Sequence, residues 1–115
     1  MDIKEKSKKL AEFLGWKKSL GITYFKDDKL TTIKHFDYVG NNDWNGMMEV
    51  VNHIENKIII PETDNCFNVT IGGGLYCTIQ DSYGELIEIT CDGATKLECV
   101  FEACVKFVEW YEMQR

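Results

Sequence analysis

The hydrophobic residues near the end of the chain recur at three- and four-residue steps, which is the spacing of one face of a helix. This spacing predicts a helix over residues 95–113. Thr95 and Glu98 have the spacing of a capping box, in which each side chain satisfies a backbone N–H at the helix start. The apolar arc covers roughly 240° of the circumference at 100° per residue. We therefore expect a sheet on one side of this helix and another helix, or a second subunit, on the other.

Two earlier segments show the same helical period. Residues 2–14 begin with capping-box spacing between Asp2 and Glu5, and Gly15 follows as a residue that tolerates the left-handed conformation common after helices. The second segment, residues 44–55, has an apolar stripe that consists of Trp44, Met47, Met48, Val51 and Ile54. The chain is therefore predicted to contain three helices.

Between residues 66 and 92 the period changes to two, which is the alternation of half-buried strands. The apolar positions are Phe67, Val69, Ile71, Leu75, Cys77, Ile79, Ile87, Ile89 and Cys91. If residues 72–74 and 82–84 are three-residue loops, all these side chains share one face. In that register Val69 faces Cys77, and Cys77 faces Ile89. The segment therefore predicts a three-stranded antiparallel meander.

Two further strand segments are predicted. Residues 22–25 and 30–33 are rich in β-branched and aromatic residues and flank a polar tetrapeptide, which indicates an additional hairpin. Residues 57–61 form a short apolar run that ends in proline, so an edge strand is expected there. The 115 residues contain one proline and no repeat or linker. We expect residues 1–115 to form a single α+β domain.

The composition restricts the classes of partner. Thirteen basic and nineteen acidic residues leave a net charge of -6, which argues against a nucleic-acid-binding surface. No signal-peptide pattern and no run of membrane-spanning length are found, so a cytoplasmic protein without a membrane partner is expected. The five cysteines include no CxxC pair, and disulfides are not expected in a reducing compartment.

The sequence contains no standard catalytic or nucleotide-binding motif, so no catalytic residue and no cofactor are predicted. Residues 72–74 are glycines between two strands, which favours a turn over a phosphate-binding loop. Three cysteines of the apolar faces could meet in the core: Cys77, Cys91 and Cys104. A zinc site would need a fourth ligand, so we interpret them as small buried hydrophobic residues and expect no metal.

The remaining residues with chemical potential give no catalytic arrangement. His35 and His53 have acidic neighbours, but such pairs are common by chance, so surface or partly buried histidines are the favoured interpretation. Cys66 precedes the first meander strand and is the cysteine expected to be most accessible, and nothing in the sequence indicates that its thiol is activated.

The second face of the meander is a candidate interaction surface. It is polar and rich in hydroxyl groups, and consists of Asn68, Thr70, Tyr76, Thr78, Gln80, Glu88 and Thr90. Such a face is either simply solvated, as in many antiparallel sheets, or a platform for a partner or ligand.

A second candidate surface lies on the C-terminal helix, where Phe107 and Trp110 occupy the edge of the apolar arc. If both shorter helices pack beside this helix, the arc is covered within one chain and the protein is a monomer. If either lies elsewhere, these two residues form an exposed patch, and a homodimer through the helix is expected.

Several short runs carry a resemblance to a known group of proteins: LAEFLGW at 10–16, MMEVV at 47–51, CTI at 77–79, TKLECVF at 95–101 and VEWY at 108–111. They are similar to runs in small uncharacterised proteins encoded by bacteriophages and prophages of gut bacteria, which are related to the phage α-β-α sandwich domain. The chain departs from that pattern at Gly46, where an aromatic residue is often found, and at Glu49, where proline is common. The resemblance implies a phage or prophage origin and a small α-β-α sandwich-like domain, and it implies no activity.

Two functions from different classes are compatible with these patterns. The first is a non-enzymatic accessory protein that binds a host or phage protein, for which the acidic balance suits a basic partner. The second is a protein that binds or sequesters a small nucleotide-like ligand. That function would require convergent Lys or Arg side chains, and the basic residues after Lys34 are only Lys57, Lys96, Lys106 and Arg115. An enzyme is disfavoured because no nucleophile–base pair is found.

Overall fold

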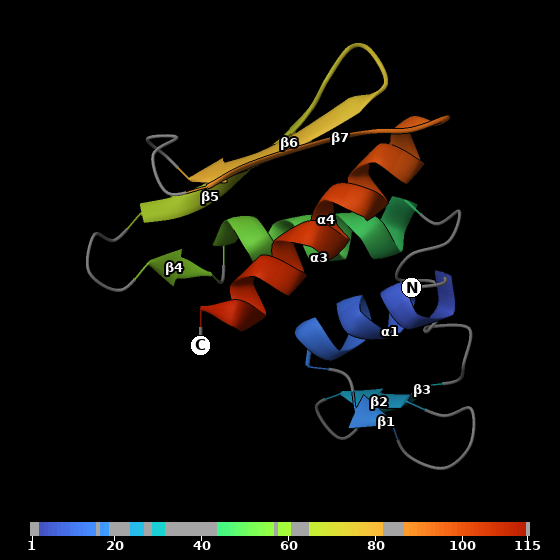
Figure 1. Cartoon of the computed structure of the whole chain (residues 1–115). Helices are drawn as coiled ribbons and strands as arrows, with labels where there is room; N and C mark the ends of the chain where they lie inside the picture. The colour runs from blue at the N-terminus through green and yellow to red at the C-terminus, as the bar shows by residue number, and fades with distance from the viewer. Residues whose placement is uncertain are drawn as a thin grey trace.

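The computed structural model describes residues 3–15, 17–18, 24–26, 29–31, 44–56, 58–60, 65–81 and 87–114 (Figure 1). Its helices are α1 (Ile3–Phe13), α3 (Trp44–Asn56) and α4 (Lys96–Met113). Its strands are β1 (Lys17–Lys18), β2 (Tyr24–Lys26), β3 (Lys29–Thr31), β4 (Ile59–Ile60), β5 (Asn65–Ile71), β6 (Tyr76–Asp81) and β7 (Glu88–Asp92). Three helices with an antiparallel meander confirm the α+β class.

The strands form two antiparallel sheets. The larger has the order β4-β5-β6-β7 and contains the predicted meander, with β4 added next to β5. The smaller has the order β1-β2-β3, and its β2–β3 pair confirms the predicted hairpin. Strand β1 was not predicted, because two lysines carry no strand signal in the sequence.

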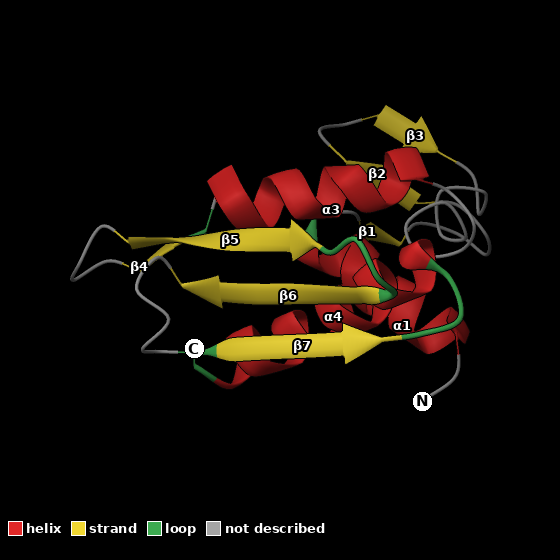
Figure 2. Ribbon diagram, turned by 90° about the horizontal axis from the view of Figure 1, so that it is seen from above, coloured by secondary structure: helices red, strands yellow, loops and turns green. Residues whose placement is uncertain are grey.

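The larger sheet is covered on one face only. Helix α4 packs against β6 and β7, α3 packs against β5, and α1 packs against α4. Seen from above, both α3 and α4 lie under the same face of the sheet (Figure 2). Among the described residues the layers therefore run sheet, helix pair, helix, and no helix covers the other face. This order differs from the α-β-α arrangement that the resemblance implies.

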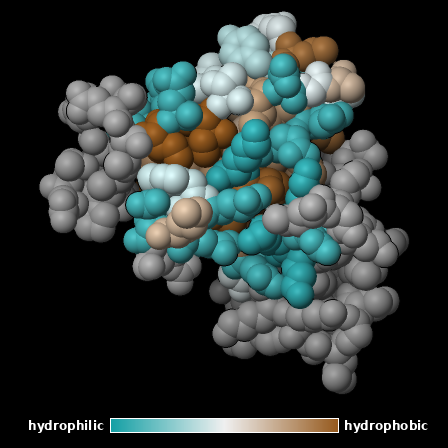
Figure 3. Space-filling view, viewed as in Figure 1, coloured by the Kyte–Doolittle hydropathy of each residue, from teal (hydrophilic) through white to brown (hydrophobic). Residues whose placement is uncertain are grey.

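The apolar residues of α4 are buried by the sheet and by both other helices. Its start is capped by Thr95, whose Oγ1 accepts a hydrogen bond from the Glu98 backbone N–H at 3.1 Å. The fully buried side chains of α4 include Val100, Cys104, Phe107 and Val108. Each large apolar side chain buried in this way stabilises the fold by about 1.5–3 kcal/mol. Among the coloured residues of Figure 3, hydrophilic side chains are widespread, and apolar side chains are visible between them.

The faces of the meander strands were predicted correctly, but the register was wrong by two residues. Leu75 was also predicted on the apolar face, but it lies in the loop before β6 and is 49% exposed. Val69 pairs with Ile79 rather than Cys77, and Cys77 pairs with Cys91 rather than Ile89. A shift of two residues keeps every side chain on its predicted face, because the side-chain period of a strand is two. Phe67 and Ile79 are accordingly buried, and Val69, Ile87 and Ile89 are partly buried against the core.

Both register shifts arise at the loops. The Gly72 backbone N–H donates to the Tyr76 carbonyl at 3.0 Å, which moves the first loop to residues 73–75. After β6, Asp81 Oδ1 accepts a hydrogen bond from the Ile87 backbone N–H at 3.1 Å. Asp81 is 2% exposed, and it extends the ladder with a side chain in place of a backbone carbonyl.

Candidate interaction surface

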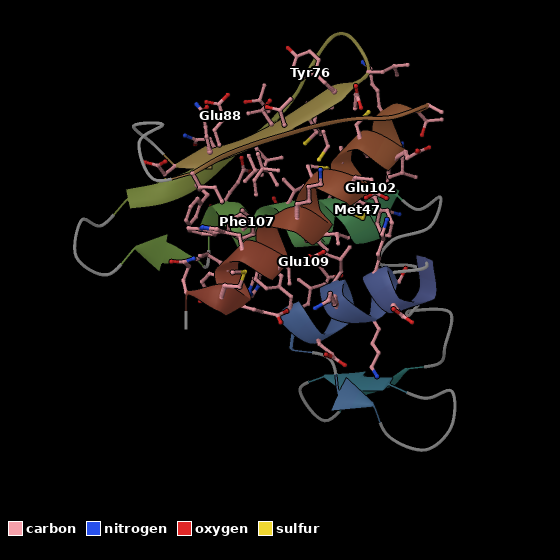
Figure 4. All side chains as sticks on the ribbon, viewed as in Figure 1. Met47, Tyr76, Glu88, Glu102, Phe107 and Glu109 are labelled. Carbon is pink, nitrogen blue, oxygen red and sulfur yellow. The ribbon has the colours of Figure 1, made fainter. Side chains whose placement is uncertain are left out.

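The structure brings all seven predicted polar residues of the meander to one side of the sheet. They are Asn68 and Thr70 on β5, Tyr76, Thr78 and Gln80 on β6, and Glu88 and Thr90 on β7. Asp92, opposite Tyr76, lies on the same side and was missed, although the period of two continues to it. We call these eight residues the outer face. Figure 4 shows Tyr76 and Glu88 on the side of the sheet away from Phe107.

The middle of the outer face is held by a pair of hydroxyl groups. The Oγ1 atoms of Thr78 and Thr90, which are cross-strand neighbours, lie 3.0 Å apart in a hydrogen bond. Both residues are β-branched, so their χ1 angles are restricted as well. The hydroxyl groups are therefore fixed in position before any partner binds.

An aromatic ring covers the hairpin end of the outer face. Tyr76 is 42% exposed, and the neighbouring Leu75 is 49% exposed. The Tyr76 ring lies directly over Gly72, where a Cβ atom would overlap the ring. Glycine at position 72 is therefore required for this ring position. The side chains of Leu75 and Tyr76 offer an apolar contact beside a polar surface.

We expect Gly72→Ala to displace the Tyr76 ring, because the new methyl group and the ring cannot occupy the same space. The domain should remain folded, since Tyr76 is an exposed side chain that can rotate away. The ring resonances of Tyr76 in an NMR spectrum measure the displacement. Gly73→Ala is the matched control, because a Cβ atom there meets nothing within 4 Å. Unchanged Tyr76 resonances in Gly72→Ala would contradict the ring position.

All the charged residues in the segment that contains the larger sheet are acidic. Residues 58–95 contain no Lys, Arg or His, and their acidic residues are Glu62, Asp64, Asp81, Glu85, Glu88 and Asp92. On the outer face this charge is carried by Glu88 and Asp92, both exposed and both on β7. The outer face therefore attracts positively charged groups toward the β7 side.

Strand β7 presents an open edge. Because Gly72 bonds to Tyr76, the even-numbered residues of β6 bond to β5 and the odd-numbered ones bond to β7. The backbone N–H and C=O groups of Glu88, Thr90 and Asp92 therefore point away from β6. No described strand pairs with this edge. An open edge of this kind can accept an additional strand.

The opposite edge of the sheet is protected. Strand β4 pairs with the first residues of β5. Further along, the Val69 backbone N–H donates to Glu55 Oε2 of α3 at 3.1 Å. A charged side chain placed on an edge strand is a common way to prevent pairing with another chain. The two edges of the sheet are therefore unequal.

Of the two alternatives predicted for the apolar arc of α4, the structure shows the one in which Phe107 is covered within the chain. Phe107 is 0% exposed, and its ring packs against Phe67 at 4.9 Å and Phe13 at 6.2 Å between ring centroids. Trp110 is half-buried against Phe67. Both shorter helices contact α4. The exposed patch of Phe107 and Trp110, on which the expected homodimer depended, is therefore not present. The oligomeric state itself stays a prediction.

Cys77, Cys91 and Cys104 are buried, and burial keeps their thiols protonated at neutral pH. Burial raises the pKa of the Cys77 thiol from 9.0 to about 11, and the neighbouring Cys91 and Cys99 add to the shift. Burial also raises the pKa of Cys104 well above its ordinary value. Burial raises the pKa of Cys91 too, although Lys106 opposes this shift. Protonated thiols are poor nucleophiles and poor metal ligands.

The remaining candidate residues of the sequence are placed as follows. No three His, Cys, Asp or Glu side chains among the described residues are placed to hold a metal ion together. His53 on α3 packs against the Phe13 ring, with centroids 4.8 Å apart. Cys66 is half-buried at the start of β5. His35 lies outside the described residues.

The described residues form a small α+β domain in which helices cover one face of the larger sheet and no described strand pairs with the β7 edge. Comparisons with protein-family models, with curated proteins and with solved structures found no match. None of the described helices combines the length and apolar character needed to span a bilayer.

Proposed function

We propose that this chain is a non-enzymatic protein-interaction module that binds a basic partner through the outer face and the β7 edge. The observation that carries the proposal is the combination of an acidic sheet face with an unpaired edge strand. The resemblance to phage and prophage proteins supports an accessory role in which the partner is a host or phage protein.

The backbone of β7 supplies the first part of the recognition. An extended segment of the partner adds to the edge as a further antiparallel strand and bonds to the outward groups of Glu88, Thr90 and Asp92. These hydrogen bonds are independent of the partner's sequence. They account for affinity, and the side chains above them account for selectivity.

The charges of β7 supply selectivity. Glu88 lies two residues before Thr90 and Asp92 lies two residues after it, so both carboxylates lie on the outer face. Alternate residues of the added strand lie beside them. Lys or Arg at those positions of the partner complements the carboxylates and speeds association.

Leu75 and Tyr76 supply an apolar anchor at the hairpin end. Tyrosine is enriched among the residues that dominate binding energy at interfaces. Because Gly72 has no Cβ atom, the Tyr76 ring can lie flat over the sheet, where a partner can cover it.

The charge of the outer face disfavours the alternative, a nucleotide-like ligand. The phosphates of such a ligand require Lys, Arg or a helix N-terminus directed at them. The strands of the outer face contain no basic residue, and their exposed charges are carboxylates.

The proposal predicts that peptides selected by this protein from a random displayed library are rich in Lys and Arg. Glu88→Lys is expected to weaken their binding by about tenfold or more, since a like charge then faces the basic side chain. Isothermal titration measures the change. Glu109→Lys is the matched control, because it makes the same change in net charge at an exposed site on α4 away from the sheet.

Equal weakening by both substitutions would show that overall charge, rather than the outer face, controls binding, and would contradict the proposal. Amide hydrogen exchange tests the strand addition independently. The amides of Glu88, Thr90 and Asp92 should exchange rapidly in the free protein and slowly in the complex.

A further inference from the structure

A pocket of about 530 Å³ opens at the end of the molecule where the helices finish. The described residues that line it are Glu12, Phe13, His53, Ile58, Tyr111 and Glu112. They come from α1, α3, the residue before β4, and α4. None belongs to the outer face, so the pocket is independent of the function proposed above.

Three helix C-termini meet at this pocket. Helices α1, α3 and α4 run in the same direction and end on the same side of the molecule (Figure 1). The unpaired carbonyl groups at a helix C-terminus carry a partial negative charge that favours a nearby cation. The last turns of α1 and α4 contain no basic residue. Each contains a glutamate instead, Glu12 in α1 and Glu112 in α4, where a negative charge is unfavourable.

The two glutamates keep most of their capacity to accept hydrogen bonds. Lys8 Nζ lies 3.9 Å from Glu12, and Lys9 Nζ lies 3.8 Å from Glu112. Both distances exceed a hydrogen bond, and such exposed ion pairs contribute little. No described residue donates a hydrogen bond to either carboxylate. A ligand that donates N–H groups can therefore bond to both.

Three rings, those of Phe13, His53 and Tyr111, line the pocket beside the two glutamates. The Phe13 ring lies 4.8 Å from the His53 ring and 6.0 Å from the Tyr111 ring, both in edge-to-face geometry. The Tyr111 ring is stacked on Phe107, which is buried behind it. An organic cation within about 6 Å of an aromatic face is attracted by the negative face of the ring.

From these features we infer that the pocket binds a guanidinium group. A guanidinium ion is planar, stacks on aromatic rings and donates to carboxylates in pairs, which an ammonium ion does not do. The carboxylates of Glu12 and Glu112 accept its N–H groups, and the rings of Phe13 and Tyr111 contact its planar face. Ile58 is 8% exposed and contributes apolar surface for an alkyl stem. The guanidinium belongs either to a free small molecule or to an arginine side chain of a protein.

Butylguanidinium and its neutral isostere butylurea test the inference. NMR titration of the whole chain should show butylguanidinium binding with a dissociation constant on the order of 1 mM, as expected for a fragment. The shifts should centre on Glu12, Phe13, Tyr111 and Glu112, and butylurea should bind at least about tenfold more weakly because it has no charge to pair with the carboxylates. Equal binding of the two compounds, or shifts elsewhere, would overturn the inference.

A double substitution tests the two carboxylates. Glu12→Gln with Glu112→Gln should reduce butylguanidinium affinity by about tenfold or more, because both charges are removed while both side chains remain polar. The variant should stay folded, since both residues are exposed. Glu109→Gln, on the same helix and outside the pocket, is the matched control and should bind like the wild type. Unchanged affinity in the double variant would also overturn the inference.

Two larger probes distinguish the sources of the guanidinium group. Agmatine represents a free small molecule, and N-acetylarginine N-methylamide represents an arginine within a chain. Tighter binding of agmatine assigns the pocket to a metabolite, and tighter binding of the blocked arginine assigns it to a protein side chain. Failure of both probes to bind would contradict the inference.

Discussion

Replacement of Phe107 by alanine is expected to lower the free energy of unfolding by about 3–5 kcal/mol, the usual cost of deleting a buried aromatic side chain. Phe107 is fully buried and contacts aromatic rings from β5, α1 and α4. The cavity would therefore open where the sheet and two helices meet. Since small domains have about 5–15 kcal/mol of stability in total, Phe107→Glu should abolish folding.

Urea unfolding followed by circular dichroism measures the effect of Phe107→Ala. Glu109→Ala, two residues further along α4 and exposed, should change the free energy of unfolding by less than about 0.5 kcal/mol. If the two alanine variants were equally stable, Phe107 could not occupy the centre of the core. That outcome would support the other alternative from the sequence, in which Phe107 and Trp110 form an exposed patch.

The stability of the protein is expected to decrease as the pH rises above 9, because the Cys77 pKa is about 11 in the folded state against 9.0 ordinarily. Below pH 9 both states are protonated, and the folded state has its full stability. Between pH 9 and 11 the unfolded thiol loses its proton while the folded thiol keeps it. The free energy of unfolding then falls by about 1.4 kcal/mol per pH unit from Cys77 alone. Cys104 contributes with the same sign.

Urea unfolding at a series of pH values measures this slope. Cys77→Ala should lower stability at neutral pH by removing a buried side chain, and it should also make the slope above pH 9 shallower. The difference between the slopes reports the loss of Cys77 together with the loss of its effect on the pKa of Cys104. Parallel curves for the two proteins would contradict the raised pKa.

The faces of the meander were predictable from the sequence, because the alternation between Phe67 and Cys91 is local. The register was not, since it depends on which backbone groups bond across the loops. The bond from Gly72 to Tyr76 and the bond from Ile87 to Asp81 each accompany a register shift of two residues, which leaves the hydrophobic pattern unchanged. The sequence therefore predicts which residues form the outer face, although it does not predict how the strands are aligned.

The surroundings of Phe107 and the pocket could not be derived from the sequence. The wide apolar arc on α4 shows that several elements must pack against this helix. It does not show whether those elements belong to the same chain or to a second copy. Likewise, Glu12 and Glu112 are far apart in the sequence. They line the same pocket because α1 and α4 pack side by side and run in the same direction. Helix direction is a tertiary property that amphipathic spacing leaves open.

The hydrogen bond from the Val69 N–H to Glu55 affects whether copies of the chain can assemble into a filament through the larger sheet. Filament growth by strand addition requires that every molecule offer a donor edge and an acceptor edge. Here the Glu55 carboxylate already bonds to the Val69 amide, so this part of the β5 edge cannot pair with a strand from another molecule. Among the described strands of the larger sheet, growth from the β7 edge of one molecule onto the β5 edge of the next is therefore disfavoured.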